Sequence, residues 1–382
     1  MRRTGVKRGV RGDGRGWPVR LLSLLLVLVS LQLGSLISPA YACGCGAMVP
    51  SRQARVAVGQ ETSVVGWDGR TEQIVMRLTV RGNAPEAAWI MPVPHRASVE
   101  LGDPAVFSEL SALTAPVRVT RHYFWPRAHD WPFGGNGKDS AAAPLPGARS
   151  VEVVGRERLG PFDVARLAAN DPEALQGWLS ENGFDLPDRL ATALKPYVDR
   201  KWEYVAVRLA PEDGANPLHG TLDPLRLRFA SDRPVYPMRL SKLAANPQEL
   251  GLYVLAAHRM EPGGRIGGDA PEVTYAGRID TRPASSDTDA LARLTGGGPV
   301  FLTAIEQSFP RPELIDGDHE LRAAGADTPY RTELYTDRLL TVGGVPAWVL
   351  SLIAVVAAAG VVVALVLVVR ARRRAATVPG TP

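Results

Sequence analysis

The longest apolar stretch of the chain runs from Ala347 to Val369 and contains no charged residue. At 1.5 Å per residue, a helix of this length crosses the hydrocarbon core of a bilayer with some tilt. Trp348 lies at its start, where indole rings prefer the headgroup level, and four arginines follow within residues 370–374. The pattern predicts a transmembrane helix rather than a buried core helix, because no face of it is polar.

A second apolar stretch lies near the N-terminus. It covers Leu21 to Leu33, follows seven basic residues, and is too short to span a bilayer comfortably. Ala40 and Ala42 then place small side chains at the two positions that signal peptidase reads. The pattern predicts a signal peptide over residues 1–42, with a retained first membrane helix as the alternative. Together the two ends predict a single-pass protein of the bacterial cell membrane, with residues 43–345 outside and the basic tail 370–382 in the cytoplasm.

Between the two ends, apolar and polar residues alternate in the manner of strands. Thr62–Trp67, the turn dipeptide Asp68-Gly69 and Thr71–Arg81 predict a half-buried hairpin. Further strands are expected at Ala88–Val93, Val117–Trp125, Ser150–Leu159, Trp202–Leu209, Leu225–Ala230, Val235–Leu240, Gly251–Arg259, Val273–Ile279, Val300–Phe309 and Tyr330–Leu340. The last residues of Ala88–Val93 include Pro92, which cannot donate to a central ladder, and Val235–Leu240 is expected to pair with Leu225–Ala230.

Helical spacing interrupts the strand pattern in a few places. Helices are expected from Asp103 to Leu113, over Asp163–Ala169, from Pro172 to Asn182, and over Leu186–Val198. Residues 126–149 are rich in Gly, Pro and Ala and predict a long loop between two lobes, 43–125 and 150–345. The predicted class is therefore α+β, a β-dominated outer domain with an inserted helical layer, plus one C-terminal transmembrane helix.

The predicted topology changes how the charge of the chain is read. The formal net charge of +5 is that of a weakly basic protein, but the leader carries +6 and the tail +4. The outer domain is left with a net charge of −5. This balance argues against nucleic acid as a partner.

Four segments resemble the bacterial domain-of-unknown-function family twenty-three thirty. They are Cys43-Gly44-Cys45 with Val64–Asp68, Trp89–Pro94, Leu179–Gly183 leading through Tyr197 to Trp202–Ala206, and Leu225–Phe229 with Val235–Leu240. These motifs are hydrophobic and architectural, without a catalytic signature. The resemblance implies an exported, often membrane-anchored domain and supplies no reaction or ligand.

The two cysteines of the chain, Cys43 and Cys45, lie at the predicted mature N-terminus. An even count in an exported chain favours a disulfide, although the Cys-Gly-Cys spacing closes a very small, strained loop. A local disulfide or inert thiols, a redox or metal role, and a lipid on Cys43 all stay open.

Two other clusters carry candidate chemistry. Asp316, Asp318, His319 and Glu320 offer oxygen and imidazole ligands for a divalent cation, against the alternative of an acidic, solvated turn. His122, Tyr123, Trp125 and Trp131 are candidates for a sugar- or peptide-binding surface, against the alternative of packing beneath the long loop.

The sequence contains no nucleophile elbow, zincin helix, P-loop or dinucleotide fingerprint. It therefore identifies no catalytic residue and no cofactor. The leading hypothesis is a non-enzymatic, membrane-anchored binding or envelope-organising module with a protein or envelope-glycan partner. A metal-dependent enzyme or envelope hydrolase and a thiol redox module at the mature N-terminus are the alternatives.

Overall fold

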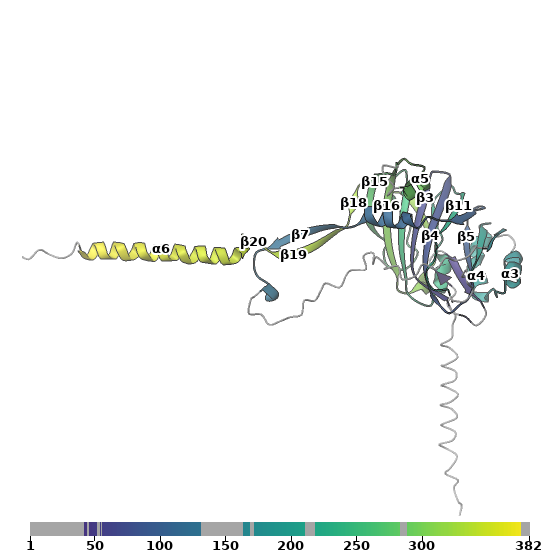
Figure 1. Cartoon of the computed structure of the whole chain (residues 1–382), viewed down its shortest axis with the longest axis horizontal. Helices are drawn as coiled ribbons and strands as arrows, with labels where there is room; N and C mark the ends of the chain where they lie inside the picture. The colour runs from purple at the N-terminus through teal and green to yellow at the C-terminus, as the bar shows by residue number, and fades with distance from the viewer. Residues whose placement is uncertain are drawn as a thin grey trace, which may run out of the picture. The chain divides into compact units, whose positions relative to one another are not determined.

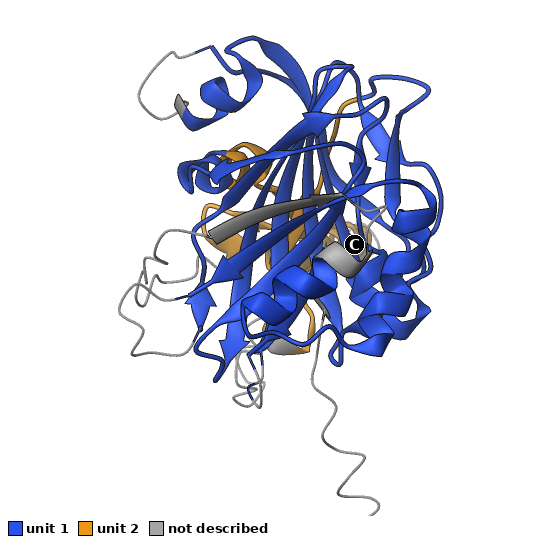
Figure 2. Cartoon of the chain, turned by 90° about the vertical axis from the view of Figure 1, so that its right-hand side faces the viewer, with its two compact units in different colours: residues 1–109, 155–328 blue, residues 110–154, 329–382 orange. Residues whose placement is uncertain are grey.

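The computed structural model describes residues 42–43, 46–51, 54, 56–130, 163–168, 172–210, 218–282 and 289–375. The chain divides into unit 1 (residues 1–109 and 155–328) and unit 2 (residues 110–154 and 329–382), which Figure 2 shows in different colours. Strands dominate the described residues, with a small helical layer and a C-terminal apolar helix. The predicted α+β class is confirmed.

The larger sheet of unit 1 is built around the hairpin of β3 (Val56–Trp67) and β4 (Thr71–Gly82), which Figure 1 labels. Asp68 closes its turn by accepting hydrogen bonds from the backbone N–H groups of Arg70 and Thr71, at 2.9 and 2.7 Å. Gly69 takes a positive φ of 98°, which only glycine adopts at little cost. The hairpin predicted from Asp68-Gly69 is present.

Strands from the second half of the chain cover both edges of this hairpin. The order is β15-β16-β13-β3-β4-β11-β6, and β10 pairs with the far end of β4. All neighbours are antiparallel except β3 and β13, which are parallel with Thr62 opposite Gly251. The bounds are β6 (Ser98–Leu101), β10 (Gly220–Thr221), β11 (Leu225–Ala230), β13 (Gln248–Ala256), β15 (Glu272–Asp280) and β16 (Pro299–Phe309).

A second sheet of unit 1 has the order β1-β2-β5-β9-β8. Its strands are β1 (Ala42–Cys43), β2 (Gly46–Pro50), β5 (Ala87–Val93), β8 (Asp163–Ala168) and β9 (Glu203–Leu209). Every residue of β5 is buried, because its two faces enter different cores. Trp89 and Met91 face a core shared with the larger sheet, whereas Ala88 and Ile90 face a core shared with helices.

Those helices are α3 (Pro172–Glu181) and α4 (Asp188–Asp199), which form the helical layer over the second sheet. Gly183 ends α3 with a φ of 81°, and the Phe184 N–H returns to the Leu179 carbonyl at 2.8 Å, a helix stop predicted from Asn182-Gly183. Two further helices, α2 (Ala105–Thr114) and α5 (Asp289–Thr295), contact β4 of the larger sheet. Arg77 of β4 lies 4.4 Å over the Phe107 ring, and Gln73 donates to the Leu294 carbonyl at 3.3 Å.

Short elements of unit 1 join the two layers. A small sheet has the order β12-β17-β14, with bounds β12 (Val235–Tyr236), β14 (Met260–Pro262) and β17 (His319–Ala323). Two 3₁₀ turns, η2 (Arg239–Leu243) and η4 (Pro312–Leu314), accompany it. Arg239 of η2 and Glu320 of β17 belong to the site described below.

Unit 2 contains a two-stranded parallel ribbon of β7 (Val117–Tyr123) and β19 (Glu333–Leu339). Arg121 of β7 lies 3.2 Å over the Tyr335 ring of β19, and Arg127 forms a 2.9 Å ion pair with Asp337. The unit also holds β18 (Tyr330–Arg331), the turn η1 (Ala128–Asp130), and the strands β20 (Thr341–Val342) and β21 (Val345–Pro346). A glycine pair with φ of 59° and 82° joins β20 to β21.

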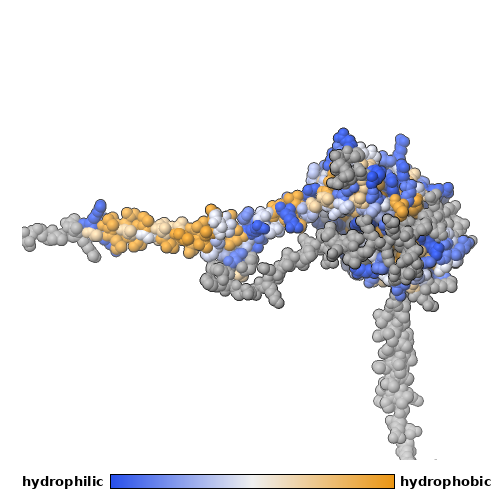
Figure 3. Space-filling model, viewed as in Figure 1, coloured by the Kyte–Doolittle hydropathy of each residue, from blue (hydrophilic) through white to orange (hydrophobic). Residues whose placement is uncertain are grey.

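Helix α6 (Ala347–Ala375) follows β21 directly. Its residues 347–373 are long and apolar enough to cross a membrane, and none of its most apolar window is buried within the described protein. Figure 3 shows the apolar colouring running along the length of the helix. The predicted C-terminal apolar helix is therefore present, and at 1.5 Å per residue it is roughly 40 Å long.

Two sequence-based element predictions are wrong. Residues 163–168 form strand β8 instead of a helix, since they pair with β9 in a register that sets Val164 opposite Val207. Val235–Leu240 does not return against β11: only β12 is extended, it pairs with β17, and the chain then turns into η2. In both places a distant strand supplies the backbone partner, which overrides local preference.

Pro92 lies in a strand that has neighbours on both sides, contrary to the expectation for an edge position. The reason is the length of β2, whose pairing with β5 ends where Ala47 lies opposite Ile90. Beyond Ile90 the strand β5 pairs only with β9, where Pro92 lies opposite Tyr204. The missing N–H of Pro92 is therefore tolerated in a locally one-sided ladder.

Several sequence-based predictions fall outside the described residues. They are the signal peptide over 1–42 except for Ala42, the loop residues 131–149, the strand Ser150–Leu159, and the end of the basic tail, 376–382. In unit 1 the strands of the two expected lobes, 43–125 and 150–345, alternate within shared sheets.

Candidate functional site

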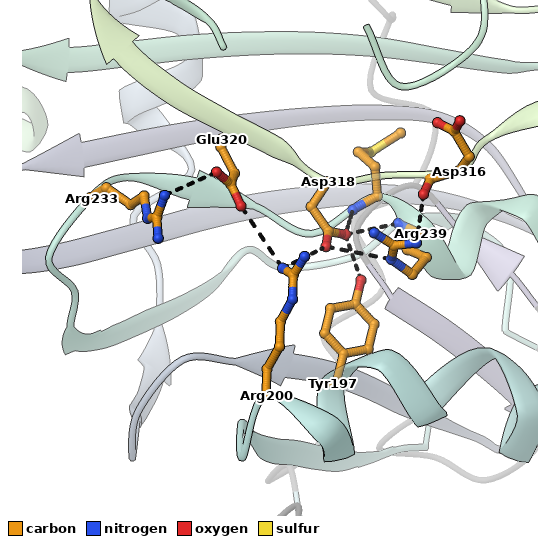
Figure 4. A network of polar contacts seen from close by, with 8 residues as sticks. Tyr197, Arg200, Arg233, Arg239, Asp316, Asp318 and Glu320 are labelled. Atoms are coloured by element: carbon orange, nitrogen blue, oxygen red, sulfur yellow. Dashed lines mark hydrogen bonds and ion pairs between the residues drawn. The ribbon is translucent and has the colours of Figure 1, made fainter. Parts of the chain in front are cut away.

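A network of charged side chains lies in unit 1 where α4, η2 and β17 meet (Figure 4). Tyr197 lies in the last turn of α4 and Arg200 directly follows this helix. Arg239 begins η2, Asp318 directly precedes β17, and Glu320 is the second residue of β17. The sheet and helix layers of unit 1 bring these residues into contact.

Asp318 is at the centre of the network, and its side chain is 1 % exposed. One carboxylate oxygen, Oδ1, accepts three hydrogen bonds: from the Tyr197 hydroxyl at 2.5 Å and from the backbone N–H groups of Met238 and Arg239 at 3.0 and 3.1 Å. The other oxygen, Oδ2, faces Arg239 Nε at 3.7 Å and Arg200 at 3.8 Å. A buried carboxylate with this many donors is held in one position.

Burial also affects the hydroxyl that donates to Asp318. The pKa of Tyr197 is raised well above its usual value, first because the phenol is desolvated and then because the Asp318 carboxylate lies beside it. Tyr197 is therefore a protonated donor throughout the physiological pH range, and it packs its ring 5.1 Å from Trp202.

Three arginines of the network differ in how many of their donor groups are hydrogen-bonded. Arg239 donates to the Asp316 carbonyl at 2.5 Å, and Arg233 pairs with Glu320 at 3.1 Å. Arg200 reaches Asp318 and Glu320 only at 3.8 and 3.9 Å, which is ion-pair distance and too long for a hydrogen bond. Arg200 therefore keeps donor groups that none of the described residues satisfies.

An open pocket of about 340 Å³ adjoins the network. Its lining residues are Arg200, Arg239, Gly263, Gly264, Arg265, Ile266, Asp316, Gly317, Asp318 and Glu320. No described residue forms a hydrogen bond or ion pair with the Arg265 guanidinium or with the Asp316 carboxylate, and Figure 4 shows the latter turned away from Asp318. Two opposite charges thus line one pocket without neutralising each other.

His319 belongs to a different environment from its neighbours, because successive residues alternate between faces along a strand. Its Nε2 lies 2.8 Å from Oε1 of Gln307, whose amide nitrogen donates to the carbonyls of Gly267 and Asp269 at 3.0 and 2.7 Å. This assigns the imidazole proton to Nε2. Burial lowers the pKa of His319 to about 4, partly offset by Asp318, so the ring is neutral at pH 7.

The structure gives separate roles to the four residues proposed as metal ligands. Asp318 is bound by Tyr197 and backbone N–H groups, Glu320 by Arg233, and His319 by Gln307, while Asp316 faces the pocket. Among the described residues, no group of three or more His, Cys, Asp or Glu side chains is arranged to hold a metal ion. Metal binding by these four residues stays a prediction.

The proposed aromatic surface lies on and beside β7 in unit 2. Tyr123 donates to both oxygens of Asp130, at 3.0 and 2.9 Å, and the Arg127 guanidinium lies 4.1 Å over its ring. His122 is exposed, and Trp125 is 69 % exposed. Trp131 falls outside the described residues, so a binding role for this surface stays a prediction.

The cysteine pair is described only in part. Cys43 lies in β1 opposite Gly46 of β2, whereas Cys45 is outside the described residues. The disulfide, redox and lipid interpretations all stay predictions.

Sequence reasoning missed Tyr197, Arg200 and Arg239 as members of a site. It assigned Tyr197 to the core by helical spacing and gave the two arginines no role. The contacts join residues that are 121 and 79 positions apart, so no local pattern reports them. The one local signal is the alternation of Asp316, Asp318 and Glu320, which places three acidic groups near one face.

These features define a strand-rich α+β protein with a C-terminal apolar helix and a charged pocket. The family model "Uncharacterized protein conserved in bacteria (DUF2330)" matches residues 39–322, and the chain belongs to this family. No curated protein matches the chain. Among solved structures, the crystal structure of baculovirus P35 is similar at 9% identity and a TM-score of 0.30, over 70% of this chain and 92% of that one.

Proposed function

We propose that the chain is a single-span membrane protein that displays unit 1 outside the cytoplasm of a bacterial cell as a binding module. The observation that carries this proposal is α6, a candidate span of 27 residues whose most apolar window is not buried by any part of the described protein. Such a surface is unfavourable in water and favourable in a bilayer.

The orientation follows from the charges that flank this helix. Arg370, Arg372 and Arg373 follow its apolar part, and basic segments stay on the cytoplasmic side. The basic, apolar leader at residues 1–42 supports export of the residues C-terminal to it.

The orientation is tested by adding protease to intact spheroplasts that express the full chain with a C-terminal epitope tag. We expect loss of the full-length chain and survival of a short tagged fragment containing α6. A cytoplasmic protein that stays uncut serves as the control for intact membranes. Cleavage of the main body only after lysis would contradict the orientation.

We propose the charged pocket as the binding site, with binding rather than catalysis as its role. Asp318 is committed to Tyr197 and to two backbone amides, which leaves it a structural part of the site. The groups that face the pocket without a partner among the described residues are the Arg265 guanidinium and the Asp316 carboxylate, with spare donors on Arg200.

This pairing favours a small zwitterionic ligand, such as the free end of a peptide or an amino acid. A guanidinium binds a carboxylate through two parallel hydrogen bonds, and a carboxylate binds an ammonium group. The volume of about 340 Å³ lies at the low end for ligand pockets and fits a ligand of this size.

The ligand class is tested by calorimetric titration of the full chain in detergent micelles with the dipeptide Ala-Ala. We expect binding that weakens roughly tenfold or more in Arg265→Gln and in Asp316→Asn, since each removes one charge-assisted contact. Arg311→Gln, an exposed arginine outside the pocket, is the matched control. Equal binding of N-acetylated, amidated Ala-Ala, or equal loss in the control, would contradict the proposal.

A further inference from the structure

An aromatic pair stands exposed at the end of the β7–β19 ribbon. The rings of Phe124 and Trp125 meet edge to face with centroids 5.2 Å apart, and the two residues are 38% and 69% exposed. Single exposed apolar residues are ordinary, but two adjacent aromatic rings form a contiguous apolar surface that marks a contact with another phase or molecule.

Hydrogen bonds connect this end of the ribbon to the start of α6. The Tyr123 carbonyl accepts the Leu340 N–H at 2.9 Å, and the Leu340 carbonyl accepts the N–H of Ala347, the first residue of α6, at 2.8 Å. Trp125 follows Tyr123 by two residues, so its backbone lies within roughly 20 Å of the helix start. The aromatic pair therefore lies near the start of α6.

The same end of the ribbon is stiffened by contacts that do not involve the pair. Arg127 covers the Tyr123 ring at 4.1 Å and forms an ion pair with Asp337 of β19 at 2.9 Å. The chain between Tyr123 and Arg127 is thus pinned at both ends. Phe124 and Trp125 lie between these two anchored residues with their rings exposed.

We propose that Phe124 and Trp125 dock in the headgroup layer of the same bilayer that α6 spans. The inference rests on the proposed membrane crossing. The Trp125 indole has one polar edge and favours the headgroup layer, and Phe124 adds apolar ring surface beside it. Hydrogen bonds through Leu340 connect this end of the ribbon with the start of the helix. The occupant of this surface is lipid.

A second point of membrane contact changes what the ribbon does. Between the ribbon and α6 lies the β20–β21 turn, in which Gly343 and Gly344 both adopt positive φ. If α6 is the sole contact with the membrane, this turn acts as a hinge between the ribbon and the helix. With the aromatic pair also seated in lipid, the ribbon has two fixed points and a defined tilt to the membrane.

Depth-dependent quenching tests the proposal in the full chain, reconstituted in phosphatidylcholine liposomes. An environment-sensitive fluorophore is attached at Trp125→Cys, with Cys43→Ala and Cys45→Ala as background. We expect blue-shifted emission that is quenched by lipids brominated near the headgroup and protected from aqueous iodide. The same label at Thr120→Cys, exposed on β7, is expected to show iodide quenching without lipid quenching.

A label at Val355→Cys in α6 separates the two proposals. Lipid quenching at position 355 without lipid quenching at position 125 overturns the docking of the aromatic pair and leaves the membrane crossing intact. Absence of lipid quenching at both positions overturns both. Protection from iodide at position 125 without lipid quenching shows a protein contact and also overturns the docking.

A second measurement avoids the cysteine substitutions. Intrinsic tryptophan fluorescence of the unlabelled chain is compared with that of Trp125→Phe in the same brominated liposomes. We expect a smaller quenched fraction in Trp125→Phe, because one lipid-seated indole is lost. An unchanged quenched fraction contradicts the proposal.

Discussion

The Asp318 carboxylate shows how much a single buried charge depends on its surroundings. Its Oδ1 atom accepts three hydrogen bonds, its Oδ2 atom faces two guanidinium groups, and only 1 % of the side chain is exposed. Such a group stabilises the fold only while every partner is present, because the partners are themselves costly to bury alone.

Replacement of Asp318 by alanine is therefore expected to cost about 3 to 5 kcal/mol of unfolding free energy, since it leaves the Tyr197 hydroxyl and the backbone N–H groups of Met238 and Arg239 without their acceptor. Asp316→Ala, two residues away and without a described side-chain partner, is the matched control and is expected to change stability by less than about 0.5 kcal/mol. Urea unfolding in detergent micelles, followed by tryptophan fluorescence, measures both. Equal effects would show that Asp318 is not the centre of the network.

His319 predicts how stability depends on pH. Its pKa in the folded state is about 4, below the 6.5 of an exposed histidine, so between these values the unfolded chain binds more protons. Stability is therefore lost as pH falls from 6.5 towards 4, by up to about 3 kcal/mol, and changes no further below that range through this group.

The test compares unfolding free energies of the natural chain and His319→Gln between pH 4 and 8. The difference between the two isolates the histidine from groups of opposite slope, such as Glu72, whose pKa burial raises. We expect the variant to have a flatter profile in this window, because it lacks the buried imidazole. Parallel curves for His319→Gln and the natural chain would contradict the assignment.

At the residue scale, the sequence indicated where polar groups cluster and not what they contact. Asp316, Asp318, His319 and Glu320 stand out as a dense run, yet the partners of Asp318 are Tyr197 and Met238, which only tertiary packing brings near. Alternation along the strand then sends His319 to Gln307 and away from the pocket.

Among the elements, helix α6 gives the most definite prediction, which concerns membrane insertion. Gly360 lies at the middle of its apolar part, and an arginine there is expected to disfavour insertion by roughly 3 kcal/mol. Gly360→Arg should therefore shift the chain from the carbonate-resistant membrane fraction to the soluble or degraded fraction. Val345→Arg, placed just before the helix, is the control and should remain in the membrane fraction.

Local sequence predicted the elements well where their signals are local. The Asp68-Gly69 hairpin turn, the Asp103 cap whose carboxylate accepts the Ala105 N–H at 2.9 Å, and the Gly183 stop all form as expected. The failures at 163–168 and 235–240 occur where pairing with β9 and β17 decides the conformation. The conformation of such a segment depends on a strand that is distant in sequence, and the composition of the segment itself does not indicate that partner.

For the whole molecule, the sequence predicted the class and the apolar C-terminal helix but not the sheet order. Strand β13 lies between β3 and β16, and β11 lies between β4 and β6. The parallel pairing of β3 with β13 joins distant parts of the chain, and nothing in hydrophobic periodicity specifies which strands meet. The charge network could not be predicted from the sequence for the same reason, because its members belong to elements that the sheet order brings together.

This sheet order also constrains how the chain folds during its synthesis. The β3–β4 hairpin is made early, but the strands that flank it, β11 and β13, leave the ribosome only after residues 230 and 256 have been added. At ordinary rates of synthesis the hairpin waits roughly 10 to 40 seconds with both backbone edges open. Nascent chains of this protein should therefore need a holding chaperone, on either side of the membrane, until the late strands arrive and close the sheet.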